Sequence, residues 1–433
     1  MASAQLTRTP SSASNLKTWT WSGWIKRSKL GNGSGGNQVL FEGRDGSGFV
    51  EKLQITQDDL FEYDHDIAGQ DYTVNTTAKF RDVNGWYHIV WTKDTTQSTE
   101  ADRIKLWVNG TQISLSESQL GYPPQNYDGL INTTGVQYIG ANAGSEYFDG
   151  LMAHVNFVDG TALTPTSFGE TDATTGIWKP KVSPSVTYGT NGYFMKFDNS
   201  ANMGLDSAGS NNYATSGSII QTKDTPSNLF ATGNPLSARH PVLSSVNNNI
   251  FFDETGQWRA VYSTLGASSG KYYMEAKVDA VGGEASIGVI PAEIASQNQD
   301  TGDYLGKETD SIGYLNNGRT FKSNSQLQTG LTSMSSGTIV GVALDLDNNT
   351  VQFYNNNSAV GNAIATTADT IYLFGFSGYS DTRFYANFGN GYFNTTAVAS
   401  AENPDDGNGI FEYDPPSGFR ALSTKSLNAE EYS

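Results

Sequence analysis

The segment RIKLWVNGTQI, residues 103–113, most constrains the fold, because it alternates apolar and polar side chains and contains an Asn-Gly pair. Alternation with a period of two is typical of a half-buried β-strand, and Asn-Gly after such a run is typical of a tight hairpin turn. Three apolar residues before the turn would share one sheet face: Ile104, Leu106 and Val108. We expect a second hairpin of this kind at NNTVQFYNNNSAV, residues 348–360.

Comparable short runs fill the first half of the chain, and we expect each to form a strand. They are TWTWSGWIKR (18–27), QVLFEG (38–43), WYHIVWTKD (86–94), VQYIGA (136–141), FDGLMAHVNFVDG (148–160) and GYFMKF (192–197). No segment of 12 or more residues keeps apolar side chains at the helical spacing of 3.6. The first half therefore predicts an antiparallel all-β sandwich.

The composition changes along the chain and indicates where the domains begin and end. Residues 198–228 are rich in Ser, Asn, Gly and Asp and contain few large apolar groups, which is typical of a linker or a long surface excursion. Strand patterns then resume in runs such as GKYYMEAKV and TIYLFGFSGY. We predict one sandwich over residues 1–197, a second over residues 229–396, and an extended C-terminal arm over residues 397–433.

The overall composition excludes several classes of protein. The net charge of −18 disfavours binding to phosphate backbones or anionic lipid. The absence of cysteine removes disulfides, thiolate zinc sites and cysteine nucleophiles. No run approaches the roughly 20 apolar residues that span a bilayer, and the N-terminal residues lack the apolar stretch of a secretory signal. We expect a soluble protein that binds no nucleic acid and does not insert into membranes.

Two domain families are suggested by specific motifs. Residues 18 to about 160 resemble the concanavalin A-like, laminin-G-type sandwich through WTWSGWIKR, GWYHIVWTKD, IKLWVNG and YFDGLMAHVNFVDG. Residues 270–390 resemble a SPRY-type sandwich through SGKYYMEAKV, SIGYLNNG, IVGVALDLDNNTVQFYNN and YANFG, with Asn355-Asn356 in place of the usual Asn-Gly turn. The resemblance implies two concanavalin A-like antiparallel β-sandwich (jelly-roll) domains in series.

The segments that join and follow these domains resemble a narrower group. GTALTPTSFGETDATTGIWKPK, YGTNGYFMKF, DTPSNLFATGNPL and PPSGFRALSTKSL are similar to tailed-phage virion proteins, common in marine phages, that couple a laminin-G-like domain to a SPRY-like one. The resemblance implies a tail fibre or capsid-attached fibre on the exterior of the virion, made in the host cytoplasm. It also implies three kinds of partner: other virion proteins, further copies of the chain as a homotrimer, and host-surface carbohydrate.

Two other functions remain open from the sequence. One is a purely architectural capsid or tail decoration protein with no host ligand. The other is a glycan depolymerase, because Glu62, Asp64 and Asp66 alternate in FEYDHD like the catalytic acids of concanavalin A-like glucanases. The alternative for these acids is a polar strand face or loop. The chain also lacks a phosphate-binding loop, a nucleophile elbow and a zinc-type histidine pair, so we predict that it is not an enzyme.

Calcium is the one cofactor that the sequence leaves open. LDLDNN offers Asp345, Asp347 and Asn348 as oxygen ligands, although the bidentate Glu of an EF-hand loop is missing. The alternative is that these side chains stabilise a turn through hydrogen bonds to the backbone. No other cofactor is predicted.

Aromatic residues are the best candidates for binding sugar. The chain has 22 Tyr, 21 Phe and 8 Trp, and seven of the tryptophans precede residue 180, where we expect them in the core. Exposed rings beside polar groups hold sugars in many lectins. Loops 299–310 and 376–384 fit this description, and the predicted glycan-binding residues are Tyr304, Tyr379, Asp381 and Arg383. The alternative for each tyrosine is a residue at the sheet rim that packs on its own sheet.

Overall fold

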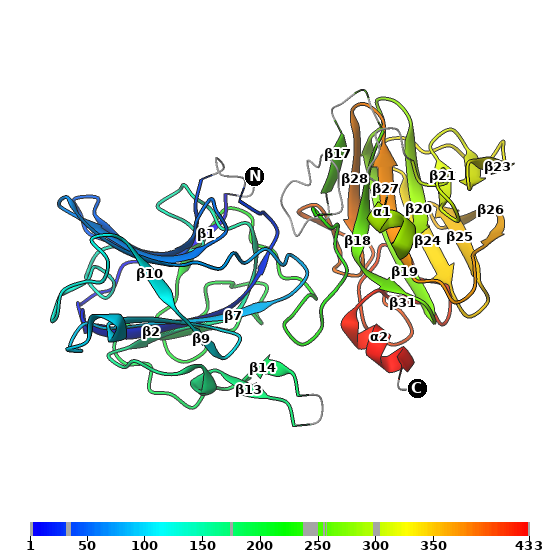
Figure 1. Cartoon of the computed structure of the whole chain (residues 1–433). Helices are drawn as coiled ribbons and strands as arrows, with labels where there is room; N and C mark the ends of the chain where they lie inside the picture. The colour runs from blue at the N-terminus through cyan, green and yellow to red at the C-terminus, as the bar shows by residue number, and fades with distance from the viewer. Residues whose placement is uncertain are drawn as a thin grey trace. The chain divides into compact units, whose positions relative to one another are not determined.

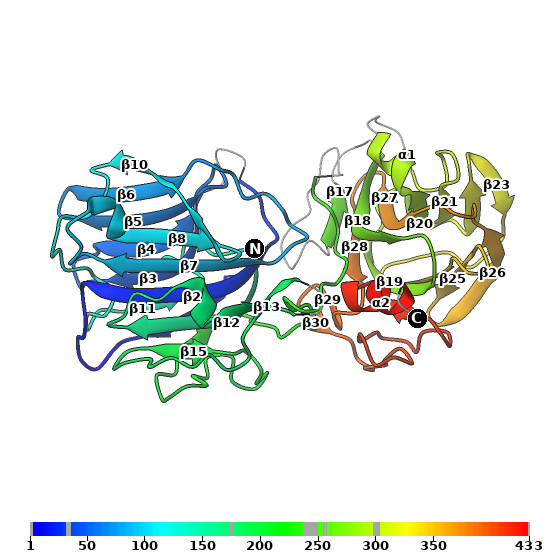
Figure 2. The same ribbon diagram turned by 60° about the horizontal axis from the view of Figure 1, so that its bottom comes forward.

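The computed structural model describes residues 3–31, 36–173, 176–236, 250–253, 256, 258–297 and 304–431. They form two compact units, Met1–Gln221 and Thr222–Ser433, and each is an almost entirely antiparallel β-structure (Figures 1 and 2). The prediction of two β-sandwiches in series is confirmed. None of the helices in the described part of the chain has the length and apolar character needed to cross a bilayer.

The first unit consists of two packed sheets and a small hairpin. The larger sheet has the order β10 (Leu115–Gln119), β6 (Gln70–Thr76), β5 (Phe61–Ile67), β4 (Val50–Ile55), β3 (Gln38–Arg44), β11 (Gln137–Ile139), β1 (Gln5–Arg8) and β16 (Ala214–Ser216). The smaller sheet has the order β15 (Tyr193–Met195), β12 (Gly150–Asp159), β2 (Thr18–Arg27), β7 (Tyr87–Asp94), β8 (Ile104–Val108) and β9 (Thr111–Ile113). The remaining elements are the hairpin β13 (Gly169–Thr171) and β14 (Trp178–Pro180), with 3₁₀ turns at η1 (Glu100–Asp102) and η2 (Pro165–Ser167).

The core of the first unit lies between these sheets, as the alternating patterns predict. Its largest fully buried side chains include Trp19, Trp21 and Trp91. Burying a ring of this size stabilises the fold more than burying a smaller apolar side chain, because each ring removes roughly 150–250 Å² of surface from water. The expected tryptophan core is therefore present in part: Trp24 is buried outside this cluster, and three tryptophans are only half-buried, namely Trp86, Trp107 and Trp178.

A buried ion pair joins the two sheets of the first unit. Lys93 Nζ on β7 lies 2.6 Å from Glu51 Oε1 on β4, and both side chains are 0% exposed. Tyr63 donates its hydroxyl proton to the same oxygen at 2.8 Å. The other oxygen accepts the backbone N–H groups of Leu130 and Ile131 at 2.7 and 2.9 Å. Burial opposes ionisation of Glu51, but Lys93 and these donors together hold its pKa below the usual value.

A histidine on the other face of β7 ties the hairpin β13–β14 to the smaller sheet. His88 Nδ1 accepts the indole N–H of Trp178 at 2.9 Å, and its Nε2 lies 2.9 Å from Ser22 Oγ. Trp24 stacks on the imidazole with ring centroids 4.7 Å apart. Burial, together with nearby His154, lowers the pKa of His88 to about 3, so the ring is neutral and Nε2 carries the proton.

Residues 198–221 are not a linker, the first of the two alternatives predicted for residues 198–228; the other was a long surface excursion. They belong to the first unit, because β16 pairs with β1 and Tyr213 is buried in the core. Asp206, which is also buried, accepts three backbone N–H groups, from Phe194, Ala208 and Asn211. The polar composition of this segment therefore reflects hydrogen-bonded turns rather than a free connection.

The second unit is also a two-sheet sandwich. One sheet has the order β17 (Ile250–Asp253), β28 (Thr382–Asn387), β19 (Lys271–Ala280), β24 (Ile339–Asp345), β25 (Thr350–Asn355) and β26 (Ser358–Ala365), and β31 (Arg420–Ala421) pairs in parallel with β19. The other has the order β18 (Arg259–Ala267), β27 (Tyr372–Gly378), β20 (Ala285–Pro291), β21 (Ile312–Leu315), β22 (Arg319–Lys322) and β23 (Ser325–Gln328). Shorter elements are α1 (Ala292–Gln297), the pair β29 (Tyr392–Phe393) and β30 (Thr396–Ala397), and α2 (Thr424–Glu431).

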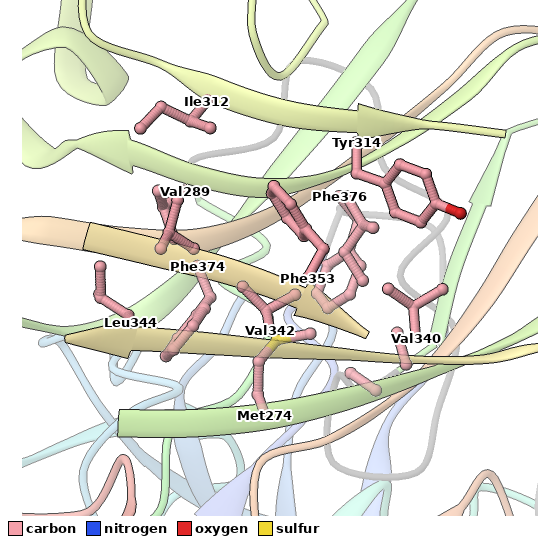
Figure 3. Close-up of a cluster of buried hydrophobic side chains, with 14 of the residues drawn as sticks. Met274, Val289, Ile312, Tyr314, Val340, Val342, Leu344, Phe353, Phe374 and Phe376 are labelled. Carbon is pink, nitrogen blue, oxygen red and sulfur yellow. The ribbon is translucent and has the colours of Figure 1, made fainter. Parts of the chain in front are cut away.

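The core of the second unit is aliphatic and phenylalanine-rich. Figure 3 shows how side chains from both sheets meet in its centre, among them Met274, Val342, Phe353, Phe374 and Phe376. The turn of the second hairpin lies one residue later than Asn355-Asn356, where the resemblance to SPRY-type domains placed it. Asn356 and Asn357 occupy the turn with φ of 46° and 67°, as Asn109 and Gly110 do in the first hairpin with 49° and 81°. Asparagine is the residue other than glycine that best tolerates this conformation.

The C-terminal segment packs on the outer face of the sheet that contains β19. Phe411 contacts Tyr273 edge-on, with ring centroids 5.1 Å apart. Glu275, which is buried on β19, accepts the backbone N–H groups of Glu412 and Tyr413 at 2.8 and 2.9 Å. The expected extended arm is thus part of the second unit and ends in the helix α2, which alternation-based reasoning did not predict.

We predict that Lys93→Met lowers the free energy of unfolding of the first unit by about 3–5 kcal/mol, because it leaves the Glu51 carboxylate buried without its cation. Urea unfolding followed by tryptophan fluorescence measures this, since seven of eight tryptophans lie in this unit. Lys105→Met is the control, because Lys105 pairs with Asp102 at the surface and should cost less than about 1 kcal/mol. Equal losses in the two variants would contradict the prediction.

We predict that acid destabilises the first unit partly through His88. The unfolded chain binds a proton at this residue below its ordinary pKa of 6.5, whereas the folded unit does so only near pH 3. Stability is therefore lost as pH falls from about 6.5 towards 3, by about 1.4 kcal/mol per pH unit for this one proton. His88→Gln, which does not titrate, should show a pH slope smaller by that amount between pH 6 and 4. An unchanged slope would show that His88 is protonated in the folded protein.

Candidate aromatic binding site

Three aromatic side chains meet at the surface of the second unit. Trp258, directly before β18, lies between Tyr304 and Tyr379, with ring centroids 5.0 Å from the first and 6.2 Å from the second. Trp258 and Tyr304 are half-buried, and Tyr379 is 39% exposed. We name these three residues the aromatic cluster. A cluster of this kind can cover the apolar face of a small ligand.

Hydrogen bonds and ring contacts hold Tyr304 in place. Its hydroxyl donates to Asn324 Oδ1 at 3.1 Å, and Phe321 on β22 packs perpendicular to its ring at a centroid distance of 5.9 Å. Leu305, the next residue, is buried and donates its backbone N–H to Ser377 Oγ at 3.0 Å. The ring therefore has a defined orientation before any ligand binds, which reduces the entropy lost on binding.

Tyr379 is positioned by a tight turn between β27 and β28. The backbone N–H of Tyr379 donates to the Glu284 carbonyl at 2.8 Å in the neighbouring β19–β20 connection. Gly283 is needed beside it, because a Cβ there would lie 2.4 Å from the Tyr379 carbonyl oxygen. Ser380 and Asp381 complete the turn with φ of 56° and 49°. The two connections thus support each other and fix the exposed ring.

The structure brings together two of the four predicted glycan-binding residues and adds a third that was not predicted. Tyr304 and Tyr379 both contact Trp258. Asp381 lies exposed in the turn two residues after Tyr379. Arg383 extends from β28 in the other sheet, where its Nη1 lies 3.0 Å from Asp279 Oδ2. No local pattern marks Trp258 in the sequence, although it is the one tryptophan outside the first unit.

The acidic triplet of the first unit lies on one strand face, as the sequence predicts. On β5, Glu62, Asp64 and Asp66 point away from the core while the intervening residues point into it. Glu62 accepts the side-chain amides of Gln54 and Asn75 at 2.6 and 3.4 Å.

Asp64 lies in the middle of this polar face. Lys52 Nζ on β4 is 3.2 Å from Asp64 Oδ2, and Thr73 on β6 donates its hydroxyl to Asp64 Oδ1 at 3.3 Å. Burial raises the pKa of Asp64 to about 6, against the opposing effect of Lys52, and nearby Asp71 raises it further. These contacts join β4, β5 and β6 and favour the alternative of a polar strand face.

The predicted calcium ligands stabilise the turn between β24 and β25. Asp345 accepts the backbone N–H of Asn348 and its side-chain amide, both at 2.9 Å, and pairs with Lys271 Nζ at 2.9 Å. Asp347 accepts the backbone N–H of Gly270 at 2.7 Å. Across the described residues, no group of three or more His, Cys, Asp or Glu side chains could hold a metal ion. The geometry favours the turn alternative.

Comparisons with known proteins agree with this architecture. The family model described as the concanavalin A-like lectin/glucanases superfamily matches residues 2–167, and the SPRY domain model matches residues 271–390. The chain therefore carries a concanavalin A-like, laminin-G-type domain followed by a SPRY domain. A search of curated proteins finds no match.

Several solved structures are similar to parts of the chain. The SPRY domain of human HERC1 is 16% identical with a TM-score of 0.29, and the match covers 36% of this chain and 96% of that one. The TRIM65 PSpry domain is 16% identical with a TM-score of 0.31, covering 36% and 89%. A heptameric SAP-like pentraxin from Limulus polyphemus is 15% identical with a TM-score of 0.27, covering 37% and 71%.

We predict that a chelator leaves the melting temperature of the protein unchanged, because Asp345 already accepts hydrogen bonds within the turn and Asp347 accepts one from the backbone of Gly270. Differential scanning fluorimetry with and without EDTA, and again with added calcium, measures this. A shift of several degrees in opposite directions under the two conditions would instead identify a structural calcium ion.

Proposed function

We propose that this chain is a carbohydrate-binding adhesion protein whose SPRY domain holds sugar on the aromatic cluster. The observation that carries the proposal is the contact of Trp258 with both Tyr304 and Tyr379 at the surface. Rings that serve only to pack a core are buried, whereas Tyr379 is 39% exposed. Rings at a surface stack on the apolar faces of sugars, while neighbouring polar groups bind their hydroxyls.

Polar groups suited to sugar hydroxyls surround the cluster. Asn324 already binds the Tyr304 hydroxyl, which still has lone pairs available to accept a proton from a ligand. Asp381, exposed beside Tyr379, offers carboxylate oxygens. The support for Arg383 as a fourth contact is weaker, because it pairs with Asp279.

We further propose that the protein is a structural component of a phage particle, a tail fibre or capsid-attached fibre that assembles with other virion proteins. The support is the resemblance of the joining and C-terminal segments to virion proteins of this type. A homotrimer would present three aromatic clusters to host-surface carbohydrate. Sites of about millimolar affinity then gain roughly 10²–10⁴ in avidity when several bind together, so weak single contacts are compatible with firm attachment.

We propose a binding role rather than a catalytic one. Glu62 and Asp64 are engaged by amides, a lysine and a threonine within the sheet. A glycosidase needs one carboxyl group as acid and another as base or nucleophile, each free to reach the glycosidic bond. The contacts of Glu62 and Asp64 support their role in joining strands.

We predict that Trp258→Ala weakens glycan binding at least tenfold, because it removes the ring that joins the other two. Binding of the full chain to an array of bacterial glycans, followed by titration calorimetry on the strongest hit, measures this. Tyr354→Ala is the matched control, since Tyr354 is a half-buried aromatic residue on β25 in the other sheet.

Two outcomes would contradict this proposal. If the wild-type chain binds no glycan on the array, the protein is not a lectin of this kind and an architectural role is favoured. If Tyr354→Ala weakens binding as much as Trp258→Ala, the sugar site lies elsewhere in the domain. Unfolding curves of both variants show whether either substitution acts only through stability.

A further inference from the structure

The charges around the aromatic cluster are distributed unequally between exposed acids and half-buried bases. Glu284 and Asp381 are both exposed in the two connections that support Tyr379. The nearby bases are Arg259, the residue after Trp258, and Lys307, three residues after Tyr304. Both bases have an interaction with another group of the protein. The two carboxylates are exposed, whereas the two cations are half-buried.

The Tyr304 hydroxyl interacts electrostatically with one cation and one anion, Lys307 and Glu284. Burial is the main reason why the pKa of the Tyr304 hydroxyl is raised; Lys307 lowers this pKa and Glu284 raises it. A ligand on the cluster would lie within reach of both side chains. A charged group on this ligand, whether positive or negative, would therefore meet one side chain of opposite charge and one of like charge.

The second unit as a whole repels anions. Residues 222–433 contain 22 Asp and Glu against 11 Lys and Arg, a net charge of −11, and the full chain carries −18. A field of this sign lowers the local concentration of polyanions and slows their association. At the cluster itself, the exposed charges of Glu284 and Asp381 add to this repulsion.

We propose that the aromatic cluster selects uncharged sugar units and rejects sugars that carry carboxylate or phosphate groups. This inference rests on the proposed function, since it names the class of carbohydrate that the same site would take. Binding then depends on ring stacking and hydrogen bonds to hydroxyls, both of which are insensitive to salt. The ligand on a host surface would be a neutral polysaccharide segment rather than a uronate-rich or phosphate-rich one.

A matched pair of oligosaccharides tests this selection. The first probe is the strongest neutral hit of the glycan array, and the second is the same oligosaccharide oxidised to a carboxylate at C6. With the full chain at 20 mM salt, the oxidised probe should bind at least tenfold more weakly. At 500 mM salt this gap should narrow, because screening shortens the range of the repulsion, whereas the Kd of the neutral probe should change less than twofold.

A charge reversal beside the cluster separates local selection from the overall charge. Glu284→Lys reverses one exposed charge. It should lower the ratio of the Kd of the oxidised probe to that of the neutral probe about fivefold. Glu293→Lys is the matched control, because Glu293 lies exposed in α1, at the other end of β20 from Glu284. It changes the net charge of the protein by the same amount and should leave the ratio unchanged.

Three results would overturn the inference. If the oxidised probe binds as tightly as the neutral one and Trp258→Ala weakens both, the site is a sugar site without charge selection, and only the proposed function stands. If Glu293→Lys narrows the ratio as much as Glu284→Lys, the discrimination comes from the whole protein and not from the cluster. If no glycan binds the wild-type chain, the proposed function and the inference fail together.

Discussion

A buried glutamate that accepts two consecutive backbone N–H groups from a distant segment organises each of the two sandwiches. In the first unit, Glu51 on β4 binds residues 130–131, about 80 positions later in the chain. In the second, Glu275 on β19 binds residues 412–413, nearly 140 positions later. Buried backbone N–H groups must find acceptors, and a carboxylate provides two oxygens that can take one each. Each glutamate therefore fixes a crossing segment that belongs to neither sheet.

The two glutamates differ in what balances their charge. Glu51 has Lys93 at 2.6 Å, so its pKa is held below the usual value despite complete burial. Around Glu275 the contacts are backbone N–H groups, the Asn387 amide and the Tyr273 hydroxyl, and burial raises its pKa to about 7. Hydrogen bonds alone offset burial less well than an adjacent cation does. The first unit thus depends on a charge pair between sheets, and the second on a hydrogen-bonded anchor for its C-terminal segment.

The same frameworks decide what could be predicted about the candidate site. Tyr304 and Tyr379 were identifiable because tyrosines in turn-rich segments between strands lie at the surface of a sandwich. Trp258 was not, because nothing local distinguishes a tryptophan that begins a strand at the surface from one in the core. Its contacts are with residues 46 and 121 positions away, which the antiparallel order β18, β27, β20 brings together. Loops that support each other, not the strand pattern, create the cluster.

Alternation and turn chemistry by themselves determined the all-β class, many of the strands and the first tight hairpin, because both act between residues close together in the chain. The tertiary structure alone decided that residues 198–221 belong to the first unit, that the C-terminal segment covers a sheet face, and that Asp345 serves a turn. It also chose Lys93 as the partner of Glu51. These outcomes depend on which distant groups meet, and burial makes an unpaired polar group costly only after the sheets have packed.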